Sequence, residues 1–300
     1  MAIPLHRCHW FLNAAKSSRL RPSESLESEL QQVYAAARAA WPTVHLAEEE
    51  YFRHLGGRCS GAPHEVHAAD LYLACACERR DSEAIRALEK DFLAHLSADL
   101  ASLKPTRELI AEVHQRLLTK FILGEDRKRP KITSYSGRGS LRSWVRAAAL
   151  RTALNQKEKE YREAMVSDAT LVEAAILGSG GEIHFLREYY QADFETALTS
   201  ALKKLSRRDR NVLRMFYLAG MSLDELASIY RVHRVSVSRW LSASRGAILD
   251  GARELLGERL RLNSLEIKSL FRLMQNHVEV SIGRLFDGEL LSHFVPRAVY

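Results

Sequence analysis

The segment from residue 137 to residue 146 contains side chains that could bind phosphate. It reads GRGSLRSWVR, so two glycines bracket Arg138, Ser140 follows, and Arg142 and Arg146 come at intervals of four. Glycine lets a backbone approach a phosphate closely, and arginine binds phosphate oxygens through charge-assisted hydrogen bonds. The pattern fits either a cradle for a small nucleotide or a turn, capped by Ser140, that begins a helix.

The surroundings of these glycines argue against a nucleotide cradle of the P-loop type. No Gly-Lys-Ser or Gly-Lys-Thr follows them, and no strand pattern precedes them. No His-Glu-x-x-His motif, carboxylate pair or Ser-His-Asp arrangement stands out in the rest of the chain. The sequence therefore predicts a protein that is not an enzyme and requires no cofactor.

Cysteines and histidines gather between residues 59 and 77, a pattern that zinc could accept. The group consists of Cys59, His64, His67, Cys75 and Cys77. Cys75 and Cys77 lie in LYLACAC, which has the pattern of a helix, where residues two apart point about 200° apart. Those two thiols could not share a metal, so buried packing is favoured over a metal site.

A second group of cationic side chains lies in residues 222–249, SLDELASIYRVHRVSVSRWLSASRGAIL. Its apolar pattern predicts two helices that cross at a tight turn around Ala227. The inner face of the first helix comprises Leu223, Leu226 and Tyr230, Val232 fills the turn, and the buried stripe of the second comprises Val237, Leu241, Ser244 and Ile248. Arg231 occupies the turn position that usually carries glycine, because a positive φ is easiest there.

The other side of that second helix is rich in arginine and serine, and no acid lies between Arg231 and Arg245. Such a face could enter the major groove of DNA, where arginine reads guanine edges and serine or arginine binds phosphates. The alternative is an ordinary helical hairpin with a solvated basic face. The candidate DNA-binding residues are Arg234, Ser236, Ser238, Arg239, Ser242 and Arg245.

The whole chain must position these two groups. Its 300 residues are 46% hydrophobic and carry a net charge of +7, which favours a folded protein with an anionic partner. The N-terminus lacks a secretory h-region and no run is long and apolar enough to cross a bilayer, so we expect a cytoplasmic protein without a membrane partner.

Apolar residues recur with helical spacing almost everywhere, which predicts an all-α fold of two small domains. We expect helices over 26–40, two between 69 and 103 parted near 79–82, one over 108–123 and one from Ser140. Residues 45–69 have the pattern of a loop. The expected divisions are an N-terminal extension (1–65), a first domain (66–160), a flexible linker (161–190), a helix-turn-helix domain (191–257) and a C-terminal helical extension (258–300).

Residues 197–227, ALTSALKKLSRRDRNVLRMFYLAGMSLDELA, and the hairpin after them resemble region 4 of bacterial RNA polymerase sigma factors. The similarity is greatest to the extracytoplasmic-function type, and within it to a myxobacterial group with extra terminal segments. In the first domain, ELIAEVHQRLL (108–118) resembles the polymerase-clamp helix of that family. The stretch SYSGRGSLRSWVRAAALRTALN (134–155) resembles the part that recognises and opens the −10 element.

The resemblance implies a sigma factor that contacts the clamp and flap of core RNA polymerase and promoter DNA, with an anti-sigma factor as a further candidate partner. Polymerase contacts would come from Glu108, Glu112 and Gln115. Contacts to the −35 element would come from the arginines and serines of the second hairpin helix. Contacts to the −10 element and the opened strand would come from Tyr135, Arg138, Ser140, Arg142, Trp144, Arg146 and Lys157.

The −10 stretch lies in a basic run without acids. The run consists of Arg127, Lys128, Arg129, Lys131, Arg138, Arg142, Arg146 and Arg151. We expect the helix from Ser140 to bury Leu141, Val145, Ala148 and Thr152, turning Arg142, Arg146 and Lys157 toward a phosphate backbone. A pocket for an unstacked base would form at Tyr135, Ser136 and the loop to Ser140.

Three alternatives remain at this point. The basic run could be a solvated face, and the chain could be a helix-turn-helix regulator that never replaces sigma; a recombinase-like DNA-binding fragment has no nucleophile to support it. Trp144 lies at the edge of the buried stripe, where packing is favoured over base stacking. Leu265, Ile267, Leu270, Phe271 and Met274 predict that the C-terminal extension packs, either on the DNA-binding domain or as an autoinhibitory segment.

Overall fold

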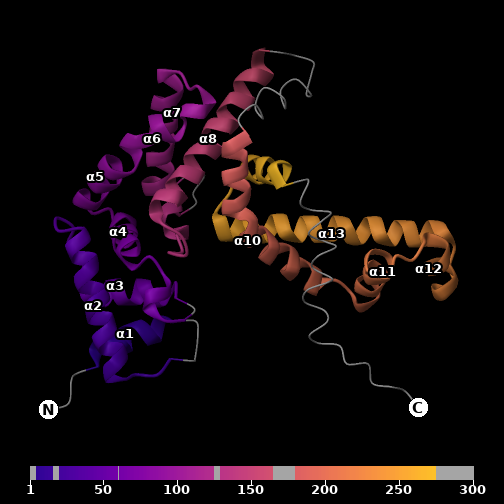
Figure 1. Cartoon of the computed structure of the whole chain (residues 1–300), viewed down its shortest axis with the longest axis horizontal. Helices are drawn as coiled ribbons and strands as arrows, with labels where there is room; N and C mark the ends of the chain where they lie inside the picture. Colours follow the sequence, from indigo (N-terminus) through magenta and orange to yellow (C-terminus); the bar gives the residue numbers. More distant parts are fainter. Residues whose placement is uncertain (1–4, 16–19, 60, 125–128, 165–179, 275–300) are drawn as a thin grey trace. The chain divides into compact units, whose positions relative to one another are not determined.

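The computed structural model describes residues 5–15, 20–59, 61–124, 129–164 and 180–274. Within these ranges every regular element is a helix, which confirms the predicted all-α class (Figure 1). The chain divides into two compact units, Met1–Ser179 and Gly180–Tyr300, called unit 1 and unit 2 below. The division falls inside the Gly-Ser-Gly-Gly tract at 178–181. Of the expected segments, 165–179 of the linker and 275–300 of the C-terminal extension lie outside the described residues.

Unit 1 begins with three helices, α1 (His6–Ala14), α2 (Glu24–Ala40) and α3 (Glu48–Gly56). The expectation of a loop over 45–69 is therefore wrong for its first half. Three glutamates in the first turn of α3 favour the helix because they lie at the positive end of its dipole. Tyr51, Phe52 and Leu55 of α3 are fully buried, so packing stabilises this short helix further.

Helix α4 (Ala68–Glu78) lies between these N-terminal helices and the rest of unit 1. It contacts α2, α3 and α5 (Ser82–Asp91), and residues 71–77 are all buried. The Tyr72 hydroxyl donates to the Val44 carbonyl and accepts from the Leu46 amide, each at 3.0 Å. The described residues before α4 thus contribute buried side chains and hydrogen bonds to the core of unit 1.

The remaining helices of unit 1 follow the expected order. Asp81 caps α5, and Thr106 caps α7 through the Leu109 amide at 3.2 Å, which accounts for where both helices begin. Helix α7 buries Leu109, Val113 and Leu117. The elements are α6 (Leu96–Asp99), α7 (Arg107–Leu118), a π-turn (Thr119–Leu123), α8 (Leu141–Ala164) and short 3₁₀ turns at Pro63–Glu65, Leu93–His95, Ala101–Leu103 and Lys131–Ser134.

Unit 2 consists of α10 (Gly180–Lys204), α11 (Arg207–Tyr217), α12 (Leu223–Tyr230), α13 (Arg234–Leu260) and a helical segment at 264–274. Helix α13 contacts α10, α11 and α12. It continues to Leu260 and so crosses the domain limit expected at residue 257.

The described part of the C-terminal extension packs within unit 2. Leu270, Phe271 and Met274 are buried, and the Phe271 ring lies edge-on to Phe194 of α10 at 5.1 Å between centroids. Leu265, expected among the packing residues, is 68% exposed. Of the two alternatives for this segment, packing on its own domain is the one that these contacts favour. None of the described helices is long and apolar enough to span a bilayer.

Candidate nucleic-acid interface

The turn between α12 and α13 has the geometry that the sequence predicted. A capping box of Ser222 and Glu225 begins α12. The helix ends at Arg231, whose backbone is left-handed with φ 52° and ψ 47°. The Val232 amide then donates to the Ala227 carbonyl at 3.0 Å, and His233 caps α13. The positive φ expected at the usual glycine position is therefore adopted here by an arginine.

The buried and exposed faces of α13 also lie as predicted. Val237, Leu241, Ser244 and Ile248 are at most 4% exposed and face α10, α11 and α12. The opposite face is solvent-exposed and carries arginine and serine, with Val235 among them at 49% exposure. Residues 231–245 of this exposed face include no acid, and an excess of cations suits a polyanion such as DNA.

The six candidate residues of α13 differ in their surroundings. Arg234, Ser238, Arg239 and Ser242 are exposed, whereas Ser236 and Arg245 are half-buried. The guanidinium of Arg234 lies 3.6 Å from the Asp224 carboxylate of α12, and both groups are exposed. The guanidinium of Arg245 instead lies over the rings of Phe216 and Tyr217 of α11, at 5.8 and 5.3 Å. Arg245 is thus held by packing, while the four exposed candidates, Arg234, Ser238, Arg239 and Ser242, lie nearer the start of α13.

This arrangement coincides with a match to a known family. Residues 195–248, from the second half of α10 to the middle of α13, match the family model described as Sigma-70, region 4. The matched segment lies within unit 2 and includes the whole helix-turn-helix up to Ile248. The match supports a DNA-binding role in transcription for this segment, of the kind that sigma-70 region 4 has. Searches of curated proteins and of solved structures each found no match.

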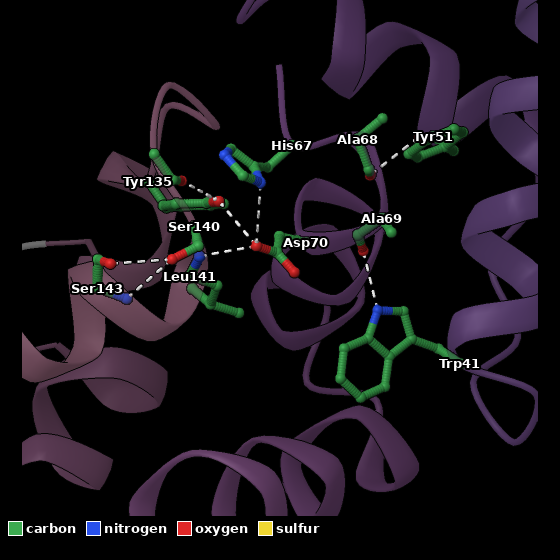
Figure 2. A network of polar contacts seen from close by, with 11 residues as sticks. Trp41, Tyr51, His67, Ala68, Ala69, Asp70, Tyr135, Ser140, Leu141 and Ser143 are labelled. Atoms are coloured by element: carbon green, nitrogen blue, oxygen red, sulfur yellow. Dashed lines mark hydrogen bonds and ion pairs between the residues drawn. The ribbon is translucent and has the colours of Figure 1, made fainter. Parts of the chain in front are cut away.

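Apart from the matched segment of unit 2, a second candidate surface lies in unit 1 at the start of α8. Ser140 caps this helix, because its hydroxyl accepts from the Ser143 amide at 3.1 Å. Asp70 of α4 accepts from the Leu141 amide at 2.7 Å and from the Tyr135 hydroxyl at 3.3 Å (Figure 2). Tyr135 is 2% exposed, so its ring lies inside the unit and not at the surface where a base could stack.

The loop before α8 presents other side chains outward. Ser136 and Arg138 are exposed, whereas Gly137 between them is buried with φ 73°. A Cβ at Gly137 would lie 2.6 Å from Leu71 Cδ1, so this position needs glycine for both conformation and space. The Gly-x-Gly pattern therefore forms a packed turn whose exposed cation is Arg138.

The basic run is only partly exposed. Helix α8 buries Leu141, Val145, Ala148 and Thr152, as predicted. The basic run is not a continuous exposed stripe, since Lys131 and Arg151 are buried at 7% and 2% exposure, and Arg142, Arg146 and Lys157, expected to turn outward, are half-buried. Arg129 and Arg138 are exposed, Arg146 is half-buried, and Arg127 and Lys128 lie outside the described residues.

Two cations of α8 bind groups of unit 1. Arg142 donates to the Asp99 carboxylate at 2.9 Å and to the Phe92 carbonyl at 3.2 Å. Lys157 donates to the Leu103 carbonyl at 2.5 Å. These bonds join α8 to α6 and its flanking turns, so both cations stabilise unit 1 in addition to any contact with DNA.

Trp144 packs within unit 1. Its ring lies 4.8 Å from that of Phe121 and 5.8 Å edge-on to that of Tyr135, measured between centroids. The indole is half-buried. Packing, the interpretation that the sequence favoured, is what the structure shows.

The three polymerase-contact candidates lie on one side of α7. Glu108 and Gln115 are exposed, and Glu112 is half-exposed and pairs with Arg116 at 2.6 Å. The backbone amide at the helix start and the Thr106 hydroxyl hold the pKa of Glu108 below its usual range. An ionised carboxylate therefore stands at the N-terminus of α7, where the helix dipole favours it.

The cysteine and histidine group does not gather around a common point. Among the described residues, no three His, Cys, Asp or Glu side chains are close enough to hold a metal ion. Cys75 and Cys77 are buried, as predicted from their helical spacing. Burial raises the pKa of Cys75 to about 11 and the pKa of Cys59 and of Cys77 to about 12, so these thiols stay protonated and pack as small apolar groups.

Three residues that hold the −10 candidate loop escaped the sequence analysis. They are Arg58, His67 and Asp70. The side chains of Arg58 and Asp70 bind residues that lie between 65 and 77 positions later in the chain, and His67 reaches the loop through its backbone amide. No spacing rule links them to the loop in sequence. The only signal was the presence of polar residues beside the apolar run 71–77, which does not identify a partner.

Proposed function

We propose that this chain is a sigma factor of the extracytoplasmic-function type, which directs core RNA polymerase to promoters. One observation carries the proposal: the exposed, acid-free face of α13 lies inside the segment that matches sigma-70 region 4. In this proposal α13 enters the major groove at the −35 element. The resemblance to a myxobacterial group belongs to the same proposal.

The surroundings of each side chain suggest its role at the −35 element. Arg239 and Ser242 lie near the middle of the open face, so they are the candidates for base contacts. Arg234 and Ser238 lie nearer its start and suit phosphate oxygens, with Ser236 beside them. Arg245 would act on the DNA backbone only by leaving the rings over which it is held.

Unit 1 would contact the −10 element and the polymerase. Arg138 and Ser136 are the exposed groups of the loop before α8, so they replace Tyr135 as the first candidates for contact with an opened strand. Ser140, Arg142, Trp144, Arg146 and Lys157 would support that surface from α8. Glu108, Glu112 and Gln115 on α7 would contact the clamp.

A second candidate function is a region 4-type DNA-binding regulator that never replaces sigma. The observation in its favour is the extent of the family match, which covers residues 195–248 and so lies entirely in unit 2. In that case unit 1 would have a different partner from the polymerase clamp.

In vitro transcription separates the two candidates. The full chain is added to core RNA polymerase over a promoter library, and the transcripts are sequenced. A sigma factor yields transcripts from a subset of promoters with common −35 and −10 sequences. Duplex binding by the chain without any transcript from core enzyme would favour the regulator.

Variants of α13 then test the interface. Removing one good base contact costs about 1–3 kcal/mol of discrimination. We therefore expect Arg239→Ala and Ser242→Ala to relax preference within the −35 element, while Arg234→Ala weakens all promoters alike. Lys268→Ala is the matched control, since Lys268 is an exposed cation of unit 2 outside the matched segment. An unchanged −35 preference in both base-contact variants would contradict this orientation of α13.

A further inference from the structure

We propose that Arg58 and Asp70 are positioning residues that hold the loop 133–140 in a fixed shape for strand opening. The inference rests on the proposed function, because it assigns a role to the loop that would contact the −10 element. It also gives the N-terminal segment, residues 1–65, a task in that step. The argument starts from the bonds that reach the loop from outside.

Arg58 binds the first part of the loop. Its side chain follows α3 and donates to the Thr133 carbonyl at 2.9 Å and to the Tyr135 carbonyl at 3.3 Å. Thr133 lies in the second half of a short 3₁₀ turn and Tyr135 directly follows it, so no further amide of that turn is available to either carbonyl. One guanidinium thus satisfies two backbone acceptors, and its charge makes each bond stronger than a neutral one.

The start of α4 binds the second part of the loop. The His67 amide donates to the Gly137 carbonyl at 2.8 Å. Asp70 accepts from the Leu141 amide and from the Tyr135 hydroxyl, and the same hydroxyl lies 2.7 Å from the Gly139 carbonyl (Figure 2). The His67 ring lies 3.9 Å from the Asp70 carboxylate.

These contacts alternate along the loop. Residues 133, 135, 137, 139 and 141 each have a backbone group or a hydroxyl bound by Arg58, His67, Asp70 or Tyr135. Of the residues between them, Ser136 and Arg138 are exposed, whereas Ser134 and Ser140 are half-buried. The loop is therefore fixed on its inner side and presents Ser136 and Arg138 on its outer side.

The N-terminal segment in turn holds the start of α4. Trp41 donates its indole N–H to the Ala69 carbonyl at 2.9 Å, and the Tyr51 hydroxyl donates to the Ala68 carbonyl at 3.0 Å (Figure 2). Asp70 is the next residue. Segment 1–65 thus acts on the loop by two routes, directly through Arg58 and indirectly through the first turn of α4.

A loop that is already ordered does not lose conformational entropy when it captures a strand. Loss of the Arg58 bonds would free the loop and slow strand opening, with no effect on recognition of the −35 element by unit 2. On a template that is already unpaired at the −10 element, the requirement for a fixed loop is much smaller.

The experiment uses the full chain, core RNA polymerase and a promoter selected in the transcription screen. Strand opening is read by permanganate reactivity of −10 thymines, on duplex DNA and on a template premelted by mismatches. We expect Arg58→Ala to reduce opening of the duplex about tenfold, the effect of one or two hydrogen bonds to a charged group. Transcription from the premelted template stays near the wild-type level.

The matched control is Arg53→Ala, which removes an exposed arginine of α3 that pairs with Glu49 and does not contact the loop. It should leave both readouts unchanged. Arg58→Lys keeps the charge but cannot donate to two carbonyls in the same way, so partial recovery is expected. Tyr135→Phe, which keeps the ring and removes only the hydroxyl, should resemble Arg58→Ala and serves if that variant does not fold.

Hydrogen exchange of the chain alone gives a readout without polymerase. Exchange of the amides of residues 133–141 should become faster in Arg58→Ala and in Tyr135→Phe, and not in Arg53→Ala. Unchanged exchange, or equal loss of transcription on duplex and premelted templates, overturns the inference. If the wild-type chain gives no transcript from either template, the proposed function is overturned and the inference with it.

Discussion

The two glycines that bracket Arg138 should respond oppositely to the same substitution. Gly137 has φ 73°, and a Cβ there would lie 2.6 Å from Leu71 Cδ1 and 2.9 Å from Leu71 Cγ. Leu71 is fully buried and cannot move aside without disturbing the core. A Cβ at Gly139 would have no heavy atom within 4 Å.

These geometries give the expected magnitudes. At Gly137, a left-handed backbone costs an alanine roughly 1 kcal/mol. Overpacking against Leu71 adds about 1–3 kcal/mol. Gly137→Ala should therefore lower the free energy of unfolding of unit 1 by roughly 2–4 kcal/mol. Gly139→Ala should change it by less than about 1 kcal/mol, and in the stabilising direction, because alanine restricts the unfolded chain.

Urea unfolding followed by tryptophan fluorescence measures the difference. The chain has four tryptophans, of which Trp10, Trp41 and Trp144 belong to unit 1. A Trp240→Phe background confines the signal to unit 1, and both glycine variants are made in it. Equal destabilisation by the two alanines would refute the assignment of Gly137 as the constrained position. A neutral Gly137→Ala would refute the close packing of the loop on α4.

Three further predictions follow from other sites. Burial, with a further contribution from Arg58 and Arg79, lowers the pKa of His54 to about 3 even though Glu78 lies 3.5 Å away. An unfolded histidine takes up its proton near pH 6.5, so stability should fall as the pH drops from about 6.5 toward 3, by up to about 1.4 kcal/mol per pH unit from this group. Chemical denaturation at several pH values should show a smaller slope in His54→Gln, and an equal slope would contradict the assignment. Arg231→Gly should stabilise unit 2 by up to about 1 kcal/mol by removing the strain at φ 52°, whereas Arg231→Ala should not, as judged by thermal unfolding. The exposed Val235 is placed to pack on a thymine methyl in the groove. Replacing that thymine by uracil should weaken binding about fourfold, because one buried methyl contributes about 0.8 kcal/mol. In a binding titration, Val235→Ala should abolish the difference between thymine and uracil.

The sequence predicted the helix-turn-helix well because the contacts that form it are local. Ala227, the turn at Arg231 and the stripe of Val237 and Leu241 lie within fifteen residues, so periodicity and one backbone requirement define them. The caps that begin α5 and α7, Asp81 and Thr106, are equally local, although the sequence analysis did not use them. Prediction from one sequence succeeds where the partners of a residue are its own neighbours along the chain.

The basic run of unit 1 was predicted poorly for the opposite reason. Its lack of acids over 127–151 suggested a continuous cationic track. Asp99, the partner of Arg142, lies 43 residues away, and the carbonyl that binds Lys157 belongs to Leu103. The local sequence shows how many cations a segment contains. Whether each cation is exposed depends on hydrogen-bond acceptors that the fold brings close from distant parts of the chain.

The apolar run of α4 indicates that the helices before it pack on it, and the expected domain division at residue 65 did not take this into account. Residues 71–77 of α4, LYLACAC, are apolar on every side, and all seven are buried. A helix that is hydrophobic all round must be covered all round, since one packed face accounts for only part of such a pattern. Helices α2 and α3 come before α4 in the chain, and α5 comes after it. Because α4 contacts all three, its apolar surface is covered by helices from both sides of it in the sequence. A division at residue 65 therefore separates α4 from part of its own core, and this is why Arg58 and Trp41 can act on the loop before α8.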